Sequence, residues 1–185
     1  MAKETYETKD YVRAEVYNAI GRPQPLFQTH KAFANGGEVS IMRGVNKKQA
    51  DYGPILSIAR QFAQEGQHSE ILAKVHAKSK TYDEVYGALR GTKYDRKCPD
   101  LRIDGKFYEF ESYVRPWNKN KIKRMLTNGL RQSDRIIIDN SGGANDRYVR
   151  KMVMARANLA GQKVREVWLY EKGKVRLFYK NNREE

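Results

Sequence analysis

The chain of 185 residues carries 36 Lys and Arg against 22 Asp and Glu, a formal net charge of +14 at pH 7. Its length suits one domain with a small appendage, and its 39% hydrophobic and 31% charged residues exclude a disordered tail. No run approaches the roughly 18 consecutive apolar residues of a membrane-spanning helix. The N-terminus has no apolar core after a basic start, so we expect a cytoplasmic protein without signal peptide. The single cysteine, Cys98, fits a reducing compartment and excludes a Cys-rich zinc module.

The positive charge is concentrated in the second half of the chain. Residues 1–91 hold 13 basic and 10 acidic residues, a balance of +3, whereas residues 92–185 hold 23 and 12, a balance of +11. A basic half beside a nearly neutral half indicates a polyanionic partner, most often nucleic acid. The alternative is a solvated basic surface that maintains solubility.

The first half of the chain divides at about residue 50. We expect residues 1–50 to form a partly irregular N-terminal appendage, with a helix over 9–20 and a strand over 38–42. Residues 51–185 are expected to form the main domain. It begins with a helix, because Gly53-Pro54 places proline at the first helical position and apolar residues follow at helical spacing. Alternating apolar residues then predict a strand over 70–76, and a short helix follows over 81–89.

The second half is predicted to contain two hairpins and two helices. Asp104-Gly105 between two strand-like runs is a strong turn signal, and it predicts a hairpin of 101–103 with 107–114. The remaining predicted elements are a helix over 118–130, a buried strand over 135–139, a helix over 145–160, and a hairpin of 166–170 with 174–179. This order predicts an α/β fold with a mixed sheet, in which an antiparallel hairpin precedes a strand–helix–strand crossover.

The first hairpin brings three carboxylates together. With Asp104-Gly105 as the turn, Asp100 faces Glu109, and Glu111 shares the face of Glu109 because side chains alternate along a strand. Three such carboxylates repel one another unless a cation binds or a pKa rises. Oxygen ligands suit Mg²⁺ or Mn²⁺, which can activate water and neutralise charge on a phosphodiester. The alternative is an exposed hairpin with solvated acids, balanced by neighbouring Arg and Lys.

The same residues carry a family resemblance. Cys98-Pro99-Asp100, the hairpin and Glu109-Phe110-Glu111 resemble the signature of the PD-(D/E)xK nuclease superfamily. The longer run CPDLRIDGKFYEFES, a basic helix and LRQSDRIII are similar to the C-terminal domains of contact-dependent inhibition toxins of the CdiA type, which are tRNA nucleases. The resemblance covers residues 51–180. It implies a restriction-endonuclease-like mixed sheet flanked by helices, with an added C-terminal helix and hairpin.

The resemblance also implies roles for particular residues. Asp100 and Glu109 correspond to metal ligands. Glu111 stands where the motif has lysine, and the hairpin geometry makes it the third candidate ligand. Lys121 and Lys123 are candidates to supply the ammonium from another position, and solvent-facing charge is the alternative for each. Gln132 would orient a phosphate or a water. Glu65 and Glu70 are the nearest candidates for the further acid that many of these folds carry.

The function we expect is a metal-dependent nuclease, toxin-like or from a mobile element, acting on RNA, including tRNA, or on DNA. The cations expected to contact nucleic acid are Arg102, Arg115, Lys119, Lys121, Lys123 and Arg124. An acidic immunity protein would complement the basic half of the chain. Two alternatives stay open: a catalytically inactive nucleic-acid-binding or interaction domain on the same fold, and a structural component of a phage or conjugative element.

Overall fold

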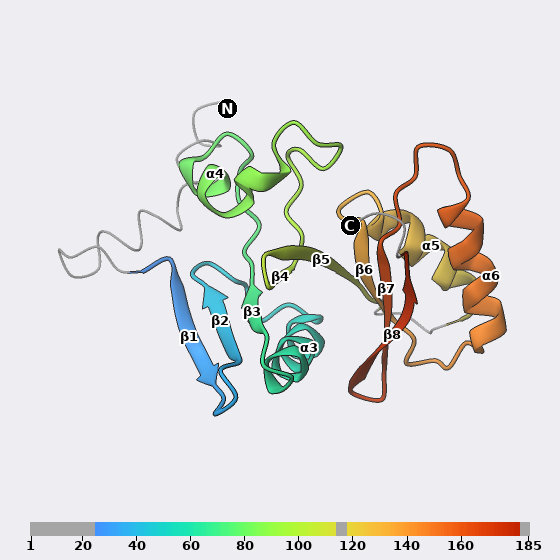
Figure 1. The fold of residues 1–185 in the computed structure, drawn as a ribbon, viewed down its shortest axis with the longest axis horizontal. Helices are drawn as coiled ribbons and strands as arrows, with labels where there is room; N and C mark the ends of the chain where they lie inside the picture. Colours follow the sequence, from blue (N-terminus) through green and yellow to red (C-terminus); the bar gives the residue numbers. More distant parts are fainter. Residues whose placement is uncertain (1–24, 114–117, 182–185) are drawn as a thin grey trace.

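The computed structural model describes residues 25–113 and 118–181, which form one eight-stranded mixed sheet with four α-helices (Figure 1). The strands follow one another across the sheet in the order β1 to β8. The elements are β1 (Phe27–Ala32), β2 (Glu38–Met42), α3 (Tyr52–Gln64), β3 (His68–Ile71), α4 (Lys80–Tyr86), β4 (Leu101–Ile103), β5 (Lys106–Glu111), α5 (Asn120–Gly129), β6 (Arg135–Asp139), α6 (Asp146–Ala157), β7 (Glu166–Glu171) and β8 (Lys174–Lys180). The predicted α/β class with a mixed sheet is confirmed.

Five of the strands run in the same direction. β2 pairs parallel with β3, and β5, β6 and β7 pair parallel with one another. β4 is antiparallel to both β3 and β5, so β3 and β5 point the same way. The carboxyl ends of β2, β3, β5, β6 and β7 therefore lie at one edge of the sheet, which we call the carboxyl edge. The edge strands β1 and β8 are antiparallel to their neighbours.

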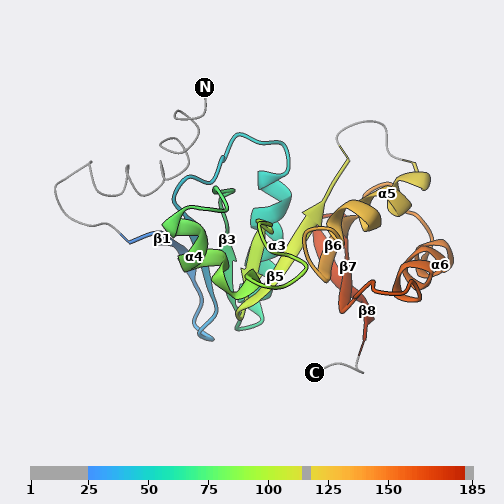
Figure 2. The same cartoon turned by 90° about the horizontal axis from the view of Figure 1, so that it is seen from above.

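The helices cover the two faces of the sheet unequally. α3 packs on one face against apolar side chains that include Tyr108 and Phe110. On the other face, α4 packs with Phe107, whereas α5 and α6 pack with Ile136 and Ile138. Figures 1 and 2 show β5 between α4 on one side and α5 and α6 on the other. Glu109 and Glu111 share the face of Phe107, so they lie between these two groups of helices.

Three strands differ from the sequence-based expectation, and one of them is β5, which ends at Glu111 although the prediction continued through residues 112 and 113. β1 was not predicted, and with β2 it places residues 27–42 in the same sheet as the rest of the chain. β3 ends at Ile71, and the predicted extension to residue 76 is wrong. The alternation that suggested it reflects burial, because Ala73 and Val75 pack beneath α4 without strand pairing. The predicted helix over 9–20 lies outside the described residues, and the division at residue 50 stays a prediction.

Gly37 provides a test of how the β1–β2 hairpin packs on α3. A Cβ at Gly37 would lie 1.8 Å from the carbonyl oxygen of Ala63, in the last turn of α3. We expect Gly37→Ala to lower the free energy of unfolding by about 2–3 kcal/mol, because backbone atoms must move to admit the methyl group. Gly53→Ala is the control, since nothing lies within 4 Å of its Cβ and alanine favours a helix. Equal urea midpoints for the two variants would contradict this packing.

Candidate active site at the carboxyl edge

The candidate site begins where β4 separates from β5. The predicted register is confirmed, with Leu101 opposite Tyr108, and the Asp104-Gly105 turn has positive φ at both residues, as a tight hairpin requires. β5 pairs with β4 over its first half and with β6 over its second half. Beyond Leu101, the Asp100 carboxylate replaces the missing strand and accepts a hydrogen bond from the Phe110 N–H at 3.1 Å.

This arrangement buries acidic side chains. Asp100 is 6% exposed and Glu109 is 5% exposed. Glu111 is partly buried against α5, where a Cβ on Gly129 would lie 3.1 Å from the Glu111 Cγ. Gly129 therefore gives Glu111 the space to lie beside the helix. All three predicted carboxylates occupy the same face, and the charge of Asp100 acts on both glutamates.

The environment disfavours the ionised form of all three acids. Burial raises the pKa of Asp100 to about 6. Burial and the charge of Asp100 raise the pKa of Glu109 above its ordinary value, and the same two causes raise the pKa of Glu111 to about 7. One oxygen of Glu109, Oε2, is buried and has no hydrogen-bond partner within the described residues. A cation that binds here would lower the free energy of the ionised acids, because opposite charge favours the carboxylate form.

Lys74 is the cation that the structure places beside this group. Its Nζ lies 4.0 Å from the Asp100 Oδ1, and its side chain is 72% exposed. Partial burial lowers the pKa of Lys74, but the negative charges of Asp100, Glu109 and Asp51 outweigh burial and raise it. Sequence analysis did not identify Lys74, or Asp51 at the start of α3, as site residues, because the sequence does not show the order of strands across the sheet. The predicted strand over 70–76 also placed Lys74 within a strand.

The predicted cations of α5 lie next to the acids. The charge of Arg124 lowers the pKa of Glu111 against the larger effect of burial, and its Nη1 lies 3.2 Å from the Tyr113 hydroxyl oxygen. Lys121 Nζ lies 3.8 Å from the centre of the Tyr113 ring. Lys119 and Lys123 are exposed on the same helix and its N-terminal end. Neither lysine proposed to supply the ammonium, Lys121 or Lys123, forms an ion pair with the acids in the described structure.

Other predicted residues lie elsewhere or have internal partners. Arg102 forms a two-point ion pair with Glu70 and also donates to the Val85 carbonyl oxygen, so its guanidinium is engaged within the protein. Gln132 follows α5, and its side chain makes no hydrogen bond to a carboxylate among the described residues, so its role stays a prediction. Glu65 is exposed just after α3. Arg115 lies outside the described residues.

The buried carboxylates suit a metal ion that takes only one or two ligands from the protein. Within residues 25–113 and 118–181, no group of three or more His, Cys, Asp or Glu side chains is arranged to hold a metal ion. Mg²⁺, however, is commonly held by one or two carboxylates together with waters and substrate phosphates. Asp100 and Glu109 fit this smaller set, since they are adjacent and one Glu109 oxygen has no partner. The ligand role of Glu111 stays a prediction.

Comparison with known proteins assigns no family to this chain. No family model, curated protein or solved structure matches it. No helix in the described part of the chain is long and apolar enough to cross a membrane.

The raised pKa of Glu111 predicts a pH-dependent stability. Because its folded-state pKa is about 7 and its ordinary value is 4.5, the folded state binds more protons between these values. Stability should therefore fall as pH rises through this window. We expect Glu111→Gln to be more stable than the wild type by about 1–2 kcal/mol at pH 8, with a smaller difference at pH 5. Urea unfolding at both pH values measures this difference, with Glu65→Gln as an exposed control. Parallel pH profiles for the wild type and Glu111→Gln would contradict it.

Proposed function

We propose that this protein is a divalent-metal-dependent nuclease on a restriction-endonuclease-like core. The observation that carries the proposal is the pair of buried carboxylates, Asp100 and Glu109, held where β4 leaves β5, with Lys74 beside them. The core order that the family resemblance implies is helix, strand, strand, strand, helix, strand. The elements α3, β3, β4, β5, α5 and β6 follow this order, with α4 inserted between β3 and β4, and this order supports the proposal. RNA, including tRNA, is the expected substrate class, with DNA as the alternative.

Each part of the site has a distinct task in phosphodiester hydrolysis. Asp100 and Glu109 would hold Mg²⁺ or Mn²⁺, which when bound neutralises phosphate charge and lowers the pKa of a bound water. In the reaction, a water oxygen attacks phosphorus and gives up one proton to the solvent. The bond from phosphorus to one ester oxygen breaks, and this leaving oxygen takes up a proton from the solvent. The exposed ammonium of Lys74 can contact a non-bridging phosphate oxygen, where negative charge increases in the transition state.

The cations of α5 extend the site. Lys119, Lys121, Lys123 and Arg124 lie on the helix that follows β5, so they can hold the nucleic-acid backbone beside the acids. Arg102 is not part of this proposal, because Glu70 and the Val85 carbonyl occupy its guanidinium. A toxin role would add an acidic neutralising partner, which complements the balance of +11 in residues 92–185.

The central prediction is metal-dependent cleavage. Incubated with Mg²⁺ or Mn²⁺, the protein should cleave at least one of tRNA, bulk RNA and plasmid DNA, and EDTA should abolish cleavage. Asp100→Asn should reduce the rate by about 100-fold or more, because it removes a charged metal ligand. The asparagine amide oxygen can still accept the hydrogen bond from the Phe110 N–H, so the fold is retained. Divalent metal should also raise the melting temperature of the wild type more than that of the variant. Intact substrates with both metals would overturn the proposal.

Lys74 supplies a second, independent prediction. Lys74→Met should lower kcat by about 10²-fold, because it removes a charge that acts on the transition state, while nucleic-acid affinity changes little. Lys80→Met is the matched control, since Lys80 is also exposed and has no carboxylate partner within the described residues. Equal rates for the two variants would remove Lys74 from the active site and leave the metal-dependent cleavage itself unaffected.

Two observations favour a second function. The described residues contain no three-ligand metal group, and glutamate replaces the motif lysine at position 111. Both facts suit a catalytically inactive nucleic-acid-binding domain on the same fold. Salt-sensitive binding without cleavage, unchanged by Mg²⁺ and by Asp100→Asn, would establish this function in place of the nuclease.

A further inference from the structure

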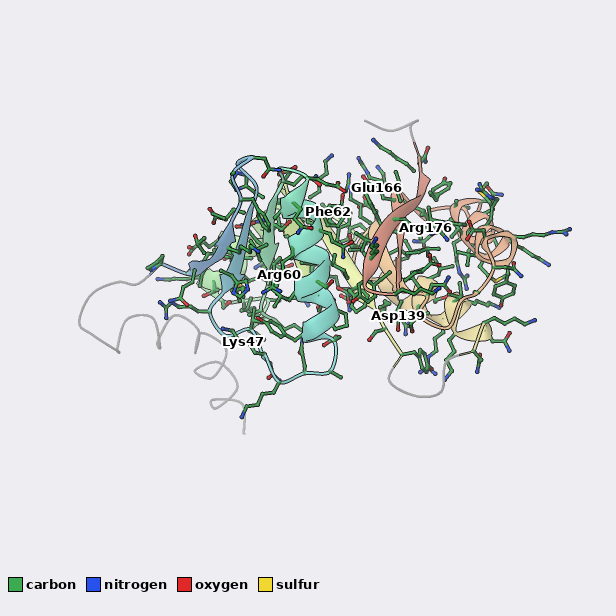
Figure 3. The ribbon with its side chains drawn as sticks, turned by 90° about the horizontal axis from the view of Figure 1, so that it is seen from below. Lys47, Arg60, Phe62, Asp139, Glu166 and Arg176 are labelled. Carbon is green, nitrogen blue, oxygen red and sulfur yellow. The ribbon has the colours of Figure 1, made fainter. Side chains whose placement is uncertain are left out.

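A polar pocket lies beside β1 and β2, away from the acidic side chains. Its volume is about 260 Å³, and its lining includes His30 from β1 with Arg43 and Lys47 from the loop after β2. Met42 and Val45 close the turn that carries Arg43, with Gly44 at a φ of 87°. Figure 3 shows Arg60 on α3 and Lys47 on the loop that precedes this helix.

The pocket presents hydrogen-bond donors. Arg60 Nη2 lies 2.9 Å from His30 Nε2. Because a guanidinium can only donate, His30 Nε2 must accept, and the ring carries its proton on Nδ1. Burial and the charges of Arg60, Lys47 and Lys31 lower the pKa of His30, in keeping with a neutral ring. The Nδ1–H has no hydrogen-bond partner in the part of the chain that the structure describes, so it is free to donate.

The positive charges around His30 have no carboxylate partner in the described part of the chain. Lys31, Arg43, Lys47 and Arg60 form no ion pair with a carboxylate among residues 25–113 and 118–181. Arg43 Nε donates to the Pro25 carbonyl oxygen at 3.0 Å, which orients the side chain and leaves its charge uncompensated. A group of donors with uncompensated positive charge suits an anion with several acceptor oxygens, such as phosphate.

The position of the pocket relates it to the acidic site. Arg43 and Lys47 follow β2, so they lie at the carboxyl edge, as do Lys74 and Glu111. The Ala73 N–H contacts Met42 Sδ at 3.3 Å, which joins the end of β2 to the segment that carries Lys74. Along the edge, β2 and β5 are three strand spacings apart, about 14 Å, and the His30–Arg60 contact lies on the α3 face of the sheet, whereas Glu109 lies on the other face. An extended nucleic-acid strand of several nucleotides can span this distance.

We infer that the pocket formed by His30, Arg43 and Lys47, with Arg60 behind His30, binds a phosphate group of the nucleic-acid backbone away from the cleaved bond. The choice of nucleic acid as the source of this phosphate rests on the proposed function. The donor set recognises phosphate and not a base, so the pocket contributes affinity and positions the strand without reading its sequence.

The test measures binding in EDTA, so that cleavage does not contribute. Fluorescence anisotropy of labelled single-stranded RNA and DNA dodecamers is compared for wild type, Lys47→Glu, Arg60→Glu and the control Lys106→Glu. Lys106 lies at the start of β5, at the opposite edge of the sheet, and the control makes the same change in charge. We expect Lys47→Glu and Arg60→Glu each to weaken binding about 10-fold. The slope of the logarithm of the binding constant against the logarithm of salt concentration should decrease in magnitude by roughly 1, whereas Lys106→Glu should change affinity less than about 2-fold.

A second measurement distinguishes the source of the phosphate. Inorganic phosphate is titrated while the imidazole NMR signals of His30 are followed, with circular dichroism to confirm that each variant folds. Perturbed His30 signals together with the affinity losses support backbone phosphate, and perturbed signals without affinity losses indicate free phosphate. Equal affinities for the three variants and unchanged His30 signals would overturn the inference. Because no arm needs catalysis, a protein that binds but does not cleave would refute only the nuclease proposal.

Discussion

The structure depends on the hydrogen bond from the Phe110 N–H to the Asp100 carboxylate. β4 is only three residues long, so the second half of β5 has β6 on one side and no strand on the other. A buried backbone N–H without a partner costs about 1–3 kcal/mol, and the Asp100 side chain removes that cost. The same bond draws a carboxylate into the core, next to the Glu109 carboxylate. The same hydrogen bond therefore satisfies the backbone of β5 and places the two carboxylates of the site side by side.

The acidic site is unfavourable for folding by itself. Two buried carboxylates and a partly buried third have raised pKa values, and Lys74 is exposed enough that its charge is partly screened by water. Such a site reaches its lowest free energy with additional positive charge or with bound protons. The protein maintains it because apolar clusters on both faces, beneath α3 and beneath α5 and α6, stabilise the sheet around it.

The direction of the strands concentrates charge at one edge. Because β2, β3, β5, β6 and β7 are co-oriented, the segments that follow them leave the sheet side by side. Arg43 and Lys47 follow β2, Lys74 follows β3, and the basic helix α5 follows β5. The carboxyl edge therefore has acids at its centre and cations on both sides, a distribution that suits a charged polymer lying along the edge. The excess of positive charge in the second half of the chain accounts only for the side formed by α5, since Arg43 and Lys47 belong to the first half.

The sequence by itself determined the elements whose signals are local. Asp104-Gly105 specified the hairpin and its register, because two consecutive residues at positive φ impose a tight turn, and the register placed Asp100, Glu109 and Glu111 on one face. Only the tertiary structure decided which other charged groups meet these acids. The cation Lys74 follows β3 and the further acid Asp51 precedes α3, and their approach to Asp100 follows from the order of strands across the sheet, which local spacing does not encode. The ion pair of Arg102 was not predicted for the same reason, since its partner Glu70 lies on the neighbouring strand β3 and is distant in sequence.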